Sequence, residues 1–491
     1  MKLGEMVIPL WLRIVVVVLS SAMTVMVFPP AEIWWMGLLA WFPLLIGLHG
    51  ASPKIGFRLG LLWGLLTYAV TLSWLWSVFK FPAVGLWLLL GCFIGVFGVA
   101  YGWVTTEKRK ALWPGLLAAV LWVGIEYFRG ELFTLRFPWI TPGTGLPPNA
   151  LTPIIGVYGV TLVVLLGSAW LVTPGWLARL TGAGTLLVMT AFVMGPQMFH
   201  RFVGGPVSNG TFKVALVQSE ELSIDNYLDL TNSVPEVVDT VVWPEHSVSA
   251  TDVRKEVRSM EHLNRLVGDR TKIVTVGTRT DLEGVKWYNT AVTIGEEGVI
   301  GTHNKNRPVH FFNDGEAAGD QKPFKTPVGM VATPICFDCD YSGVARRLTK
   351  NGAEVFLVPS MDPKSWTAKQ HEQHGVLFRH RAAENGRYFA VASSSGVTQI
   401  IDQAGGVVQR LPLMEDDVLV GMVGLVQRQT YFTRSGWRLA PLCMWITLGI
   451  LLWVFTDVGR QWFYDRKAGK WTSRKLDGDG AVVGAVDVGE D

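Results

Sequence analysis

The first 200 residues of this sequence are almost without charge. They contain 11 Lys/Arg and 5 Asp/Glu, and no aspartate precedes Asp225. Charged residues make up 17% of the whole 491-residue chain, against roughly 25% in ordinary soluble domains. This scarcity argues against a simple soluble enzyme, and the 49% of hydrophobic residues excludes a disordered chain. The other 67 charged residues lie in 201–491, where the composition is close to that of a globular domain.

Cysteine is also scarce, and common cofactor motifs are missing. The four cysteines, Cys92, Cys336, Cys339 and Cys443, do not have the spacing of a disulfide framework. No GxGxxG follows an expected strand and no phosphate-binding P-loop occurs, so a nucleotide cofactor has no support. The net charge of +3 gives no support to a nucleic-acid partner.

Long apolar runs are what the N-terminal part does contain. Because about 20 apolar residues span a bilayer, we expect spans at 8–28, 33–49, 58–79, 83–105, 111–129, 151–173, 176–197 and 437–456. The first run begins like a signal peptide, but further spans follow at once and no clear cleavage site ends it. The chain therefore divides into a membrane domain of about seven transmembrane helices (1–205), a polar domain (206–428), a last transmembrane helix (429–457) and a partly disordered cytoplasmic tail (458–491).

Lysine and arginine are unevenly divided between the two sets of loops that connect these spans. The richer set holds Lys54, Arg58, Lys108, Arg109, Lys110, Arg179 and the basic residues that follow the last span. The poorer set holds Lys80, Arg129 and Arg136. Because basic loops stay in the cytoplasm, we expect a cytoplasmic N-terminus and a polar domain on the outer face of the membrane.

The polar domain alternates β-branched runs with helical segments, a pattern typical of a layered α/β fold. Strands are expected at 212–218, 239–243, 272–278, 288–294, 328–335, 354–359, 387–394 and 418–424, and helices at 251–269, 342–351 and 367–385. Ahead of this domain, 131–150 is rich in proline and glycine. Such irregular backbone must lie in protein or water rather than in lipid, so this segment is either a connecting loop or the lip of a lipid-entry cleft.

Three chemically capable residues follow apolar strands of the polar domain. Glu245 comes after Trp243 and Pro244, Lys305 follows the strand 298–302, and Cys336 ends the strand 328–335. A carboxylate in a cleft can act as a general base, and a cysteine at a strand end can act as a nucleophile. Taken singly, an acid or a lysine at a strand end is more often a solvated surface residue.

Cys336 and Cys339 also form a CxxC pair, which is compatible with redox chemistry or with zinc. A zinc site needs two more ligands at similar spacing, and none is evident near His371 or His374. His371, His374 and His380 share one expected helix, but no acidic residue completes a metalloprotease pattern. We expect these histidines to be polar helix positions.

The order Glu245, Lys305, Cys336 resembles the Glu-Lys-Cys triad of the nitrilase (carbon-nitrogen hydrolase) superfamily. The segments 335–360 and 374–408 resemble the nucleophile segment and the later helix–strand–hairpin segment of that superfamily. The membrane spans, the run Phe137-Pro138-Trp139 and the pair Tyr288-Asn289 are similar to one branch, bacterial apolipoprotein N-acyltransferase. The resemblance implies a multi-span α-helical membrane domain with an inserted α/β nitrilase-like domain, an α-β-β-α sandwich.

The same resemblance implies a ping-pong acyl transfer at Cys336. The nucleophile takes a fatty acyl chain from a phospholipid as a thioester, and the amine of a diacylglyceryl-modified lipoprotein cysteine then accepts it. Glu245 is expected to act as base, and Lys305 with backbone N–H groups near Phe337 to stabilise the oxyanion. Neither a cofactor nor a metal is implied, and the partners are membrane lipid and lipoproteins.

Four further residues are expected to support the site. These supporting residues are Asn289, Glu316, Phe337 and Asp338. Phe337-Asp338 stands where that branch usually has Tyr-Glu after its cysteine. Glu316 is the only acid of its type near the segment where the branch usually has Gly-Glu-Tyr.

The resemblance to this branch also implies a place in the cell, and two rival functions remain open. The implied location is the bacterial cytoplasmic (inner) membrane, with the catalytic domain on the periplasmic face. One rival is a membrane-tethered nitrilase-like amidase that acts on a small soluble amide. The other is a non-catalytic scaffold or transporter, against which the complete triad and the scarcity of charge in the spans argue.

Overall fold

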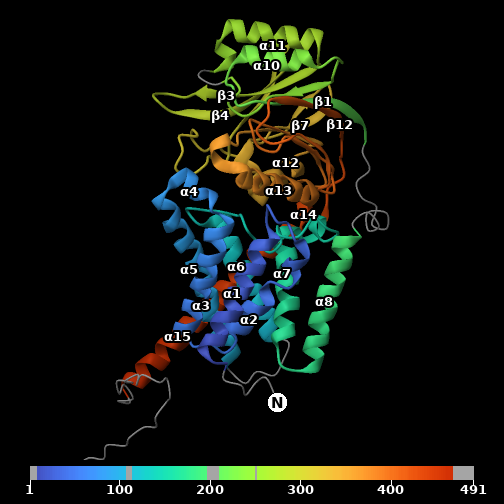
Figure 1. The fold of residues 1–491 in the computed structure, drawn as a ribbon. Helices are drawn as coiled ribbons and strands as arrows, with labels where there is room; N and C mark the ends of the chain where they lie inside the picture. Colours follow the sequence, from blue (N-terminus) through green and yellow to red (C-terminus); the bar gives the residue numbers. More distant parts are fainter. Residues whose placement is uncertain (1–7, 107–112, 196–208, 249–251, 468–491) are drawn as a thin grey trace, which may run out of the picture.

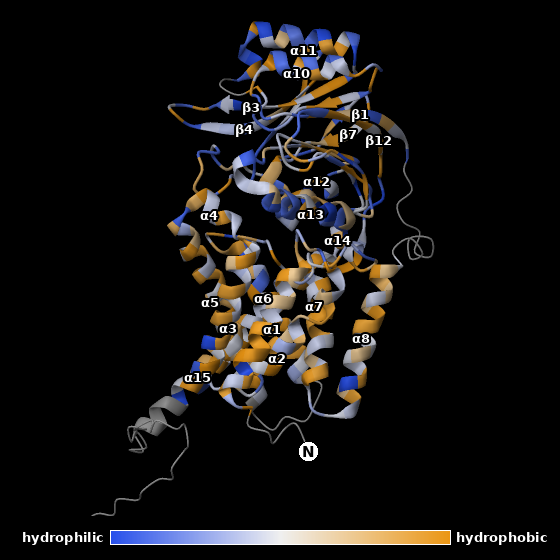
Figure 2. Cartoon of the chain, viewed as in Figure 1, coloured by the Kyte–Doolittle hydropathy of each residue, from blue (hydrophilic) through white to orange (hydrophobic). Residues whose placement is uncertain are grey.

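The computed structural model describes residues 8–106, 113–195, 209–248 and 252–467. A bundle of helices forms one half of the molecule, and a layered α/β domain stands on one end of it (Figure 1). Hydrophobic residues dominate the helical half, whereas hydrophilic and hydrophobic residues are mixed in the α/β half (Figure 2). The structure thus confirms a multi-span helical domain joined to an α/β domain.

The helical half contains nine α-helices among the described residues. They are α1 (Leu10–Val27), α2 (Trp41–Leu48), α3 (Pro53–Thr71), α4 (Trp74–Phe79), α5 (Phe81–Thr106), α6 (Trp113–Tyr127), α7 (Thr152–Val172), α8 (Trp176–Met194) and α15 (Leu439–Lys467). Five of them, α1, α5, α7, α8 and α15, are long and apolar enough to cross a membrane. Exposed Leu187 on α8 and exposed Trp445 and Leu452 on α15 are typical of a lipid-facing surface.

Three predicted spans correspond to elements that fall short of a plain transmembrane helix. The span 33–49 is divided into a short 3₁₀ helix (Trp34–Leu38) and α2. In the span 111–129, the described residues form the 15-residue helix α6, which passes into a π-helical turn at Phe128–Leu132. The third, 58–79, is covered by α3, whose first turns carry Lys54 and Arg58, and by α4. Glycines let α3 lie directly on α5, since a Cβ at Gly60 would meet the carbonyl oxygen of Ile94.

Two six-stranded mixed sheets pack face to face in the α/β half. Their strand orders are β12-β1-β2-β3-β4-β5 and β11-β10-β9-β8-β7-β6. The strands are β1 (Thr211–Gln218), β2 (Thr240–Val242), β3 (Ile273–Asp281), β4 (Trp287–Gly295), β5 (Gly298–Asn304), β6 (Phe324–Thr326), β7 (Gly329–Ala332), β8 (Val355–Ser360), β9 (Tyr388–Ser393), β10 (Gln399–Ile401), β11 (Val407–Arg410) and β12 (Asp417–Gly424). Buried aliphatic side chains from both sheets, among them Val214, Leu216, Val355 and Leu357, form the core between them.

Helices cover the outer faces of both sheets and complete an α-β-β-α sandwich. The pair α10 (Ile224–Ser233) and α11 (Val257–Asp269) lies on the side remote from the bundle, whereas α12 (Ser342–Lys350) and α13 (Thr367–Asn385) lie between the second sheet and the bundle (Figure 1). A short helix, α14 (Tyr431–Arg434), leads from the sandwich into α15. The predicted fold class is confirmed.

The proline-rich segment after α6 joins the two halves. The Trp139 indole donates a hydrogen bond to Asp340, 2.5 Å away, and the Tyr341 hydroxyl donates to the carbonyl of Arg136 at 3.2 Å. Glu384 of α13 accepts a hydrogen bond from the backbone N–H of Val157 at 2.9 Å, directly after the kink that Gly156 makes in α7. The segment is therefore packed in protein rather than in lipid.

Part of the basis for the predicted membrane orientation falls outside the described residues. The stretches outside the described residues include Lys108, Arg109, Lys110 and the tail beyond Lys467. The link between α7 and α8, next to Arg179, lies at the end of the bundle remote from the sandwich (Figure 1). The orientation itself stays a prediction.

Candidate active site

The predicted base, lysine and nucleophile meet at one edge of the two sheets. Glu245 follows β2, Lys305 follows β5, and Cys336 begins the 3₁₀ helix η5 (Cys336–Asp340) after β7. Lys305 Nζ lies 2.7 Å from Glu245 Oε1. The Cys336 thiol is close enough for both charges to act on its pKa. Because β2 is parallel to β3 and β7 is parallel to β8, their carboxyl ends form the kind of crevice in which α/β folds bind ligands.

The backbone of Cys336 is held in a rarely used conformation. Its φ is +46°, and positive φ at a non-glycine residue is typical of strained functional positions. The side chain is 4% exposed, and its sulfur lies 3.7 Å from the carbonyl oxygen of Met361. Burial raises the pKa of the Cys336 thiol well above its ordinary value, and the carboxylate of Glu245 adds to this rise although Lys305 opposes it. Cys336 is therefore a thiol at rest, and attack by a thiol requires a base.

Lys305 is a buried cation between two carboxylates. Its ammonium lies 2.7 Å from Glu245 Oε1 and 2.7 Å from Asp314 Oδ2. Burial by itself would lower the pKa of Lys305, but the charges of Asp314 and Glu245 outweigh burial and raise the pKa well above the ordinary value. Lys305 therefore keeps its proton, and it acts as a fixed positive charge rather than as a base.

Asp314 is a site residue that the sequence-based assignment missed. Burial would raise the pKa of Asp314, but Lys305 outweighs it and holds the pKa below the usual range. Glu316, which was expected here, does not join the site: its carboxylate is half exposed and lies 3.5 Å from Lys286. Gly315, at φ +80°, lies between the two acids in the loop, and the backbone N–H of Val309 holds Asp314 in place at 2.7 Å.

Asn289 of β4 connects the two carboxylates. Its amide nitrogen lies 2.5 Å from Glu245 Oε1, 2.6 Å from Asp314 Oδ1 and 3.2 Å from His246 Nε2. The residue is fully buried, so this amide fixes the position of both acids around the ammonium. Asn289 thus lies within the candidate site, and its supporting role stays a prediction.

Phe337 and Asp338 support the nucleophile in different ways. Asp338 accepts hydrogen bonds from the backbone N–H groups of Asn306 at 2.9 Å and Arg307 at 2.8 Å, and it pairs with His303 at 2.9 Å. It therefore ties the loop that carries Lys305 to the turn that carries the nucleophile, without touching the triad. Phe337 packs edge-on against Tyr341 and lines the cleft described below.

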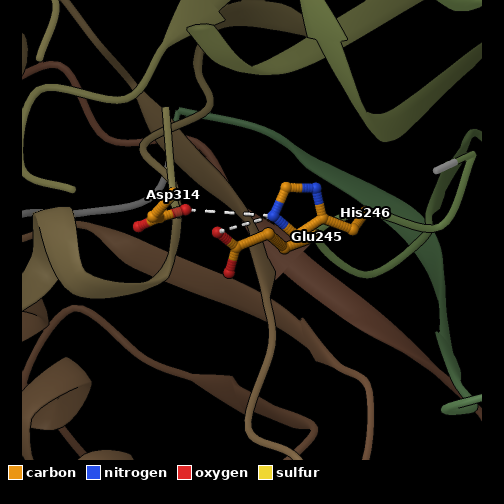
Figure 3. A group of neighbouring side chains, drawn as sticks. All are labelled: Glu245, His246 and Asp314. Carbon is orange, nitrogen blue, oxygen red and sulfur yellow. Dashed lines mark ion pairs between the residues drawn. The ribbon is translucent and has the colours of Figure 1, made fainter. Parts of the chain in front are cut away.

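Glu245, His246 and Asp314 form a cluster that resembles a metal-binding group (Figure 3). Their ligand atoms lie within 4.8 Å of one another. The ammonium of Lys305 already lies 2.7 Å from both carboxylates. A charged lysine therefore takes the place that a metal ion would need, and these residues do not fit a metal site.

The histidines of α13 are buried rather than solvated. His374 lies between Asp362, 2.8 Å from its Nδ1, and Asp340, 3.1 Å from its Nε2. Burial would lower the pKa of His374, but the two aspartates raise it to about 10. His371 and His380 instead contact the carbonyls of Pro363 and Thr144. Helical spacing alone could not show that partners from other elements would surround them.

A mainly apolar cleft opens from Cys336 toward the helical half. It encloses about 680 Å³, part of which is open to solvent. Its apolar wall includes side chains of α4, α5, the 135–139 segment and the 309–312 loop. Trp74, Phe79, Phe137 and Phe312 are among them. The cleft has the size and character of a site for an apolar ligand, and it lies where the helical half meets the sandwich.

Two family models match the chain, one in each half. Residues 20–170 match the apolipoprotein N-acyltransferase N-terminal domain, and 228–431 match carbon-nitrogen hydrolase. An apolipoprotein N-acyltransferase of Geobacter metallireducens is 26% identical over 87% of this chain and 92% of its own length. One of Pseudomonas aeruginosa PAO1 is 27% identical over 90% of this chain and 96% of its own. A solved structure, Saccharomyces cerevisiae Nit3 of the nitrilase superfamily, has 21% identity, covers 44% of this chain and 91% of its own, and gives a TM-score of 0.38.

Proposed function

We propose that the chain is an apolipoprotein N-acyltransferase, which moves a fatty acyl chain from a phospholipid to the N-terminal amine of diacylglyceryl-modified lipoproteins. The observation that carries this proposal is the apolar cleft, which leads from Cys336 to helices α4 and α5. Both substrates are lipids, and this cleft gives a lipid chain a route to a nucleophile that is closed to bulk water.

In the first half-reaction, Glu245 accepts the proton of the Cys336 thiol while the sulfur attacks the carbonyl carbon of a phospholipid ester. A carbon–sulfur bond forms, and the carbonyl oxygen becomes an oxyanion. The fixed charge of Lys305 lowers the energy of this oxyanion in a site from which water is largely excluded. The carbon–oxygen ester bond then breaks, and Glu245 gives its proton to the leaving lysophospholipid oxygen.

In the second half-reaction, the acceptor amine attacks the thioester carbonyl. Glu245 takes a proton from the amine as the carbon–nitrogen bond forms, and the same positive charge stabilises the second oxyanion. The carbon–sulfur bond breaks, and the proton returns to Cys336. Glu245 is deprotonated again at the end of each half-reaction, so the cycle needs no cofactor.

We further propose that the enzyme lies in the bacterial inner membrane with its sandwich on the periplasmic side. The basic residues that favour this orientation include Lys54, Arg58 and Arg179. Acceptor lipoproteins would then meet the cleft at the outer leaflet.

Mass spectrometry of the purified, membrane-reconstituted protein tests the proposal. After exposure to a phospholipid of defined chains, we expect one fatty acyl adduct on Cys336 and its loss on addition of a diacylglyceryl-cysteine peptide. Cys336→Ala should carry no adduct, whereas Cys339→Ala, the matched control, should carry it. Hydrolysis of small amides without any phospholipid adduct would support the amidase alternative and reject acyl transfer.

A further inference from the structure

Three nitrogen-rich side chains gather at the edge of the cleft, outside the triad. Arg136 comes from the segment that joins the two halves, and Arg307 and His310 come from the loop after Lys305. Arg136 and His310 line the cleft. The Arg307 guanidinium lies over the ring of Tyr341, 5.4 Å from its centroid, and the Tyr341 hydroxyl donates to the Arg136 carbonyl at 3.2 Å.

These side chains have donors that nothing in the described part of the chain uses. Arg136 Nε, Arg307 Nε and His310 Nε2 are buried atoms without a hydrogen-bond partner. Across the described residues, no carboxylate lies within 4.0 Å of either guanidinium. Buried donors of this kind are usually completed by a water molecule or a ligand.

The acids around this cluster are engaged by other partners. Asp338 pairs with His303 at 2.9 Å, and Asp314 pairs with Lys305 at 2.7 Å. Asp340 pairs with His374 at 3.1 Å and accepts a hydrogen bond from Trp139. Glu131 accepts hydrogen bonds from the backbone and the hydroxyl of Ser342, at 3.1 and 2.8 Å. The positive charge of the cluster is therefore not neutralised locally. Burial and the two arginines together lower the pKa of His310, which agrees with a positive field at this place.

We propose that Arg136 and Arg307, with His310 beside them, bind the phosphate of the phospholipid donor while its acyl ester lies at Cys336. Guanidinium groups bind phosphate oxygens through paired, charge-assisted hydrogen bonds. The inference rests on the proposed function, since it assigns a head-group contact to the donor of that reaction.

The position of the cluster fits a lipid phosphate. Arg136 and His310 lie on the cleft wall where the apolar helical half meets the sandwich. Lipid head groups occupy the polar layer at the end of such apolar helices. The ring of His310 lies 6.4 Å from that of Phe337, the residue directly after the nucleophile. In a phospholipid only a few covalent bonds separate the acyl ester from the phosphate. One bound donor can therefore reach both Cys336 and the cluster.

Equilibrium binding to the full-length, detergent-solubilised Cys336→Ala protein tests this site without any chemistry. The probes are a short-chain phosphatidylethanolamine and the diacylglycerol with the same chains, which lacks only the phosphate head group. We expect Arg136→Gln and Arg307→Gln each to weaken binding of the phospholipid by about tenfold or more and to leave diacylglycerol binding unchanged. Arg265→Gln, on the exposed face of α11, is the matched control and should bind both lipids normally.

Each other outcome of this experiment rejects the site. Equal losses for both lipids would show that the substitutions disturb the cleft rather than remove a phosphate contact. Unchanged phospholipid binding by the arginine variants would also reject the site, if inorganic phosphate bound to either variant no less tightly than to the parent protein. If millimolar inorganic phosphate bound to the arginines but did not compete with the phospholipid, the ligand would be free phosphate rather than a head group. Acylation of wild-type Cys336 is measured separately, so the acyl-transfer proposal can stand when this one falls.

Discussion

Replacing Lys305 by methionine would leave two buried carboxylates without their cation. Lys305 Nζ lies 2.7 Å from both Glu245 and Asp314, and its side chain is 1% exposed. Removing one partner of a buried ion pair costs about 3–5 kcal/mol of unfolding free energy. Loss of an oxyanion-stabilising charge costs roughly a hundredfold or more in turnover. Lys305→Met should therefore lower both stability and acylation, and the single variant cannot separate the two.

A second substitution separates them. Asp314→Asn removes one of the two stranded charges, so the double variant Lys305→Met/Asp314→Asn should regain a large part of the lost unfolding free energy. It should not regain acylation, because the charge that faces the oxyanion is still missing. Thermal unfolding measures the first quantity, and the rate of Cys336 acylation from phospholipid, followed by mass spectrometry, measures the second.

Lys305→Arg provides a further control, because it keeps the charge but replaces a point-like ammonium by a larger planar group. We expect it to fold and to acylate poorly. Acylation within about twofold of wild type in the double variant would refute the reasoning, since Lys305 would then act only by holding the carboxylates together. Unchanged stability in Lys305→Met would refute the magnitude assigned to the buried ion pair.

Three further predictions concern the nucleophile, the orientation and the pH dependence of stability. Cys336→Ala should abolish turnover in a lipoprotein acylation assay, whereas Cys339→Ala should keep most of it; the reverse result would reassign the nucleophile. An impermeant thiol reagent on intact cells should label a cysteine placed at Arg265 but not one placed at Arg460, and the opposite labelling would reverse the topology. Because the pKa of His374 is raised from 6.5 to about 10 in the folded chain, its stabilising contribution is complete below pH 6.5 and is lost as the pH rises through about 10. The Tm of wild type should therefore approach that of His374→Gln between pH 7 and 10, and a constant difference would show that the imidazole is not charged.

Most of the fold follows from patterns that are local in sequence. The expected strands at 212–218, 272–278 and 354–359 agree with β1, β3 and β8 to within a few residues, because each is a β-branched run that is buried on both sides. The short strand β6 was not expected, and β10 and β11 were expected only as part of the hairpin that the resemblance over 374–408 implies. They have only three or four residues, and pairing with a neighbouring strand rather than their own sequence defines them.

The helical half shows a similar division. Long apolar runs predicted α1, α5, α7, α8 and α15, since a spanning helix is recognised by length and hydropathy alone. The run 33–49 was expected to form one span, but it bends between a 3₁₀ helix and α2, and its residues Leu44, Leu45 and Leu48 are buried within the bundle. Hydropathy does not distinguish a helix that faces lipid from one that faces other helices.

The acid beside Lys305 could not be identified from sequence spacing. Asp314 and Glu316 lie two residues apart in one irregular loop, and either could have paired with an ammonium. The turn at Gly315 and the hydrogen bond from the N–H of Val309 place Asp314 inside, where Asn289 reaches it from β4. Asn289 comes from another strand, so the choice depends on a contact between segments that are distant in sequence. The positions of Glu245, Lys305 and Cys336 are predictable because regular strands place them, whereas the residue that completes their charge balance is selected by the folded loop.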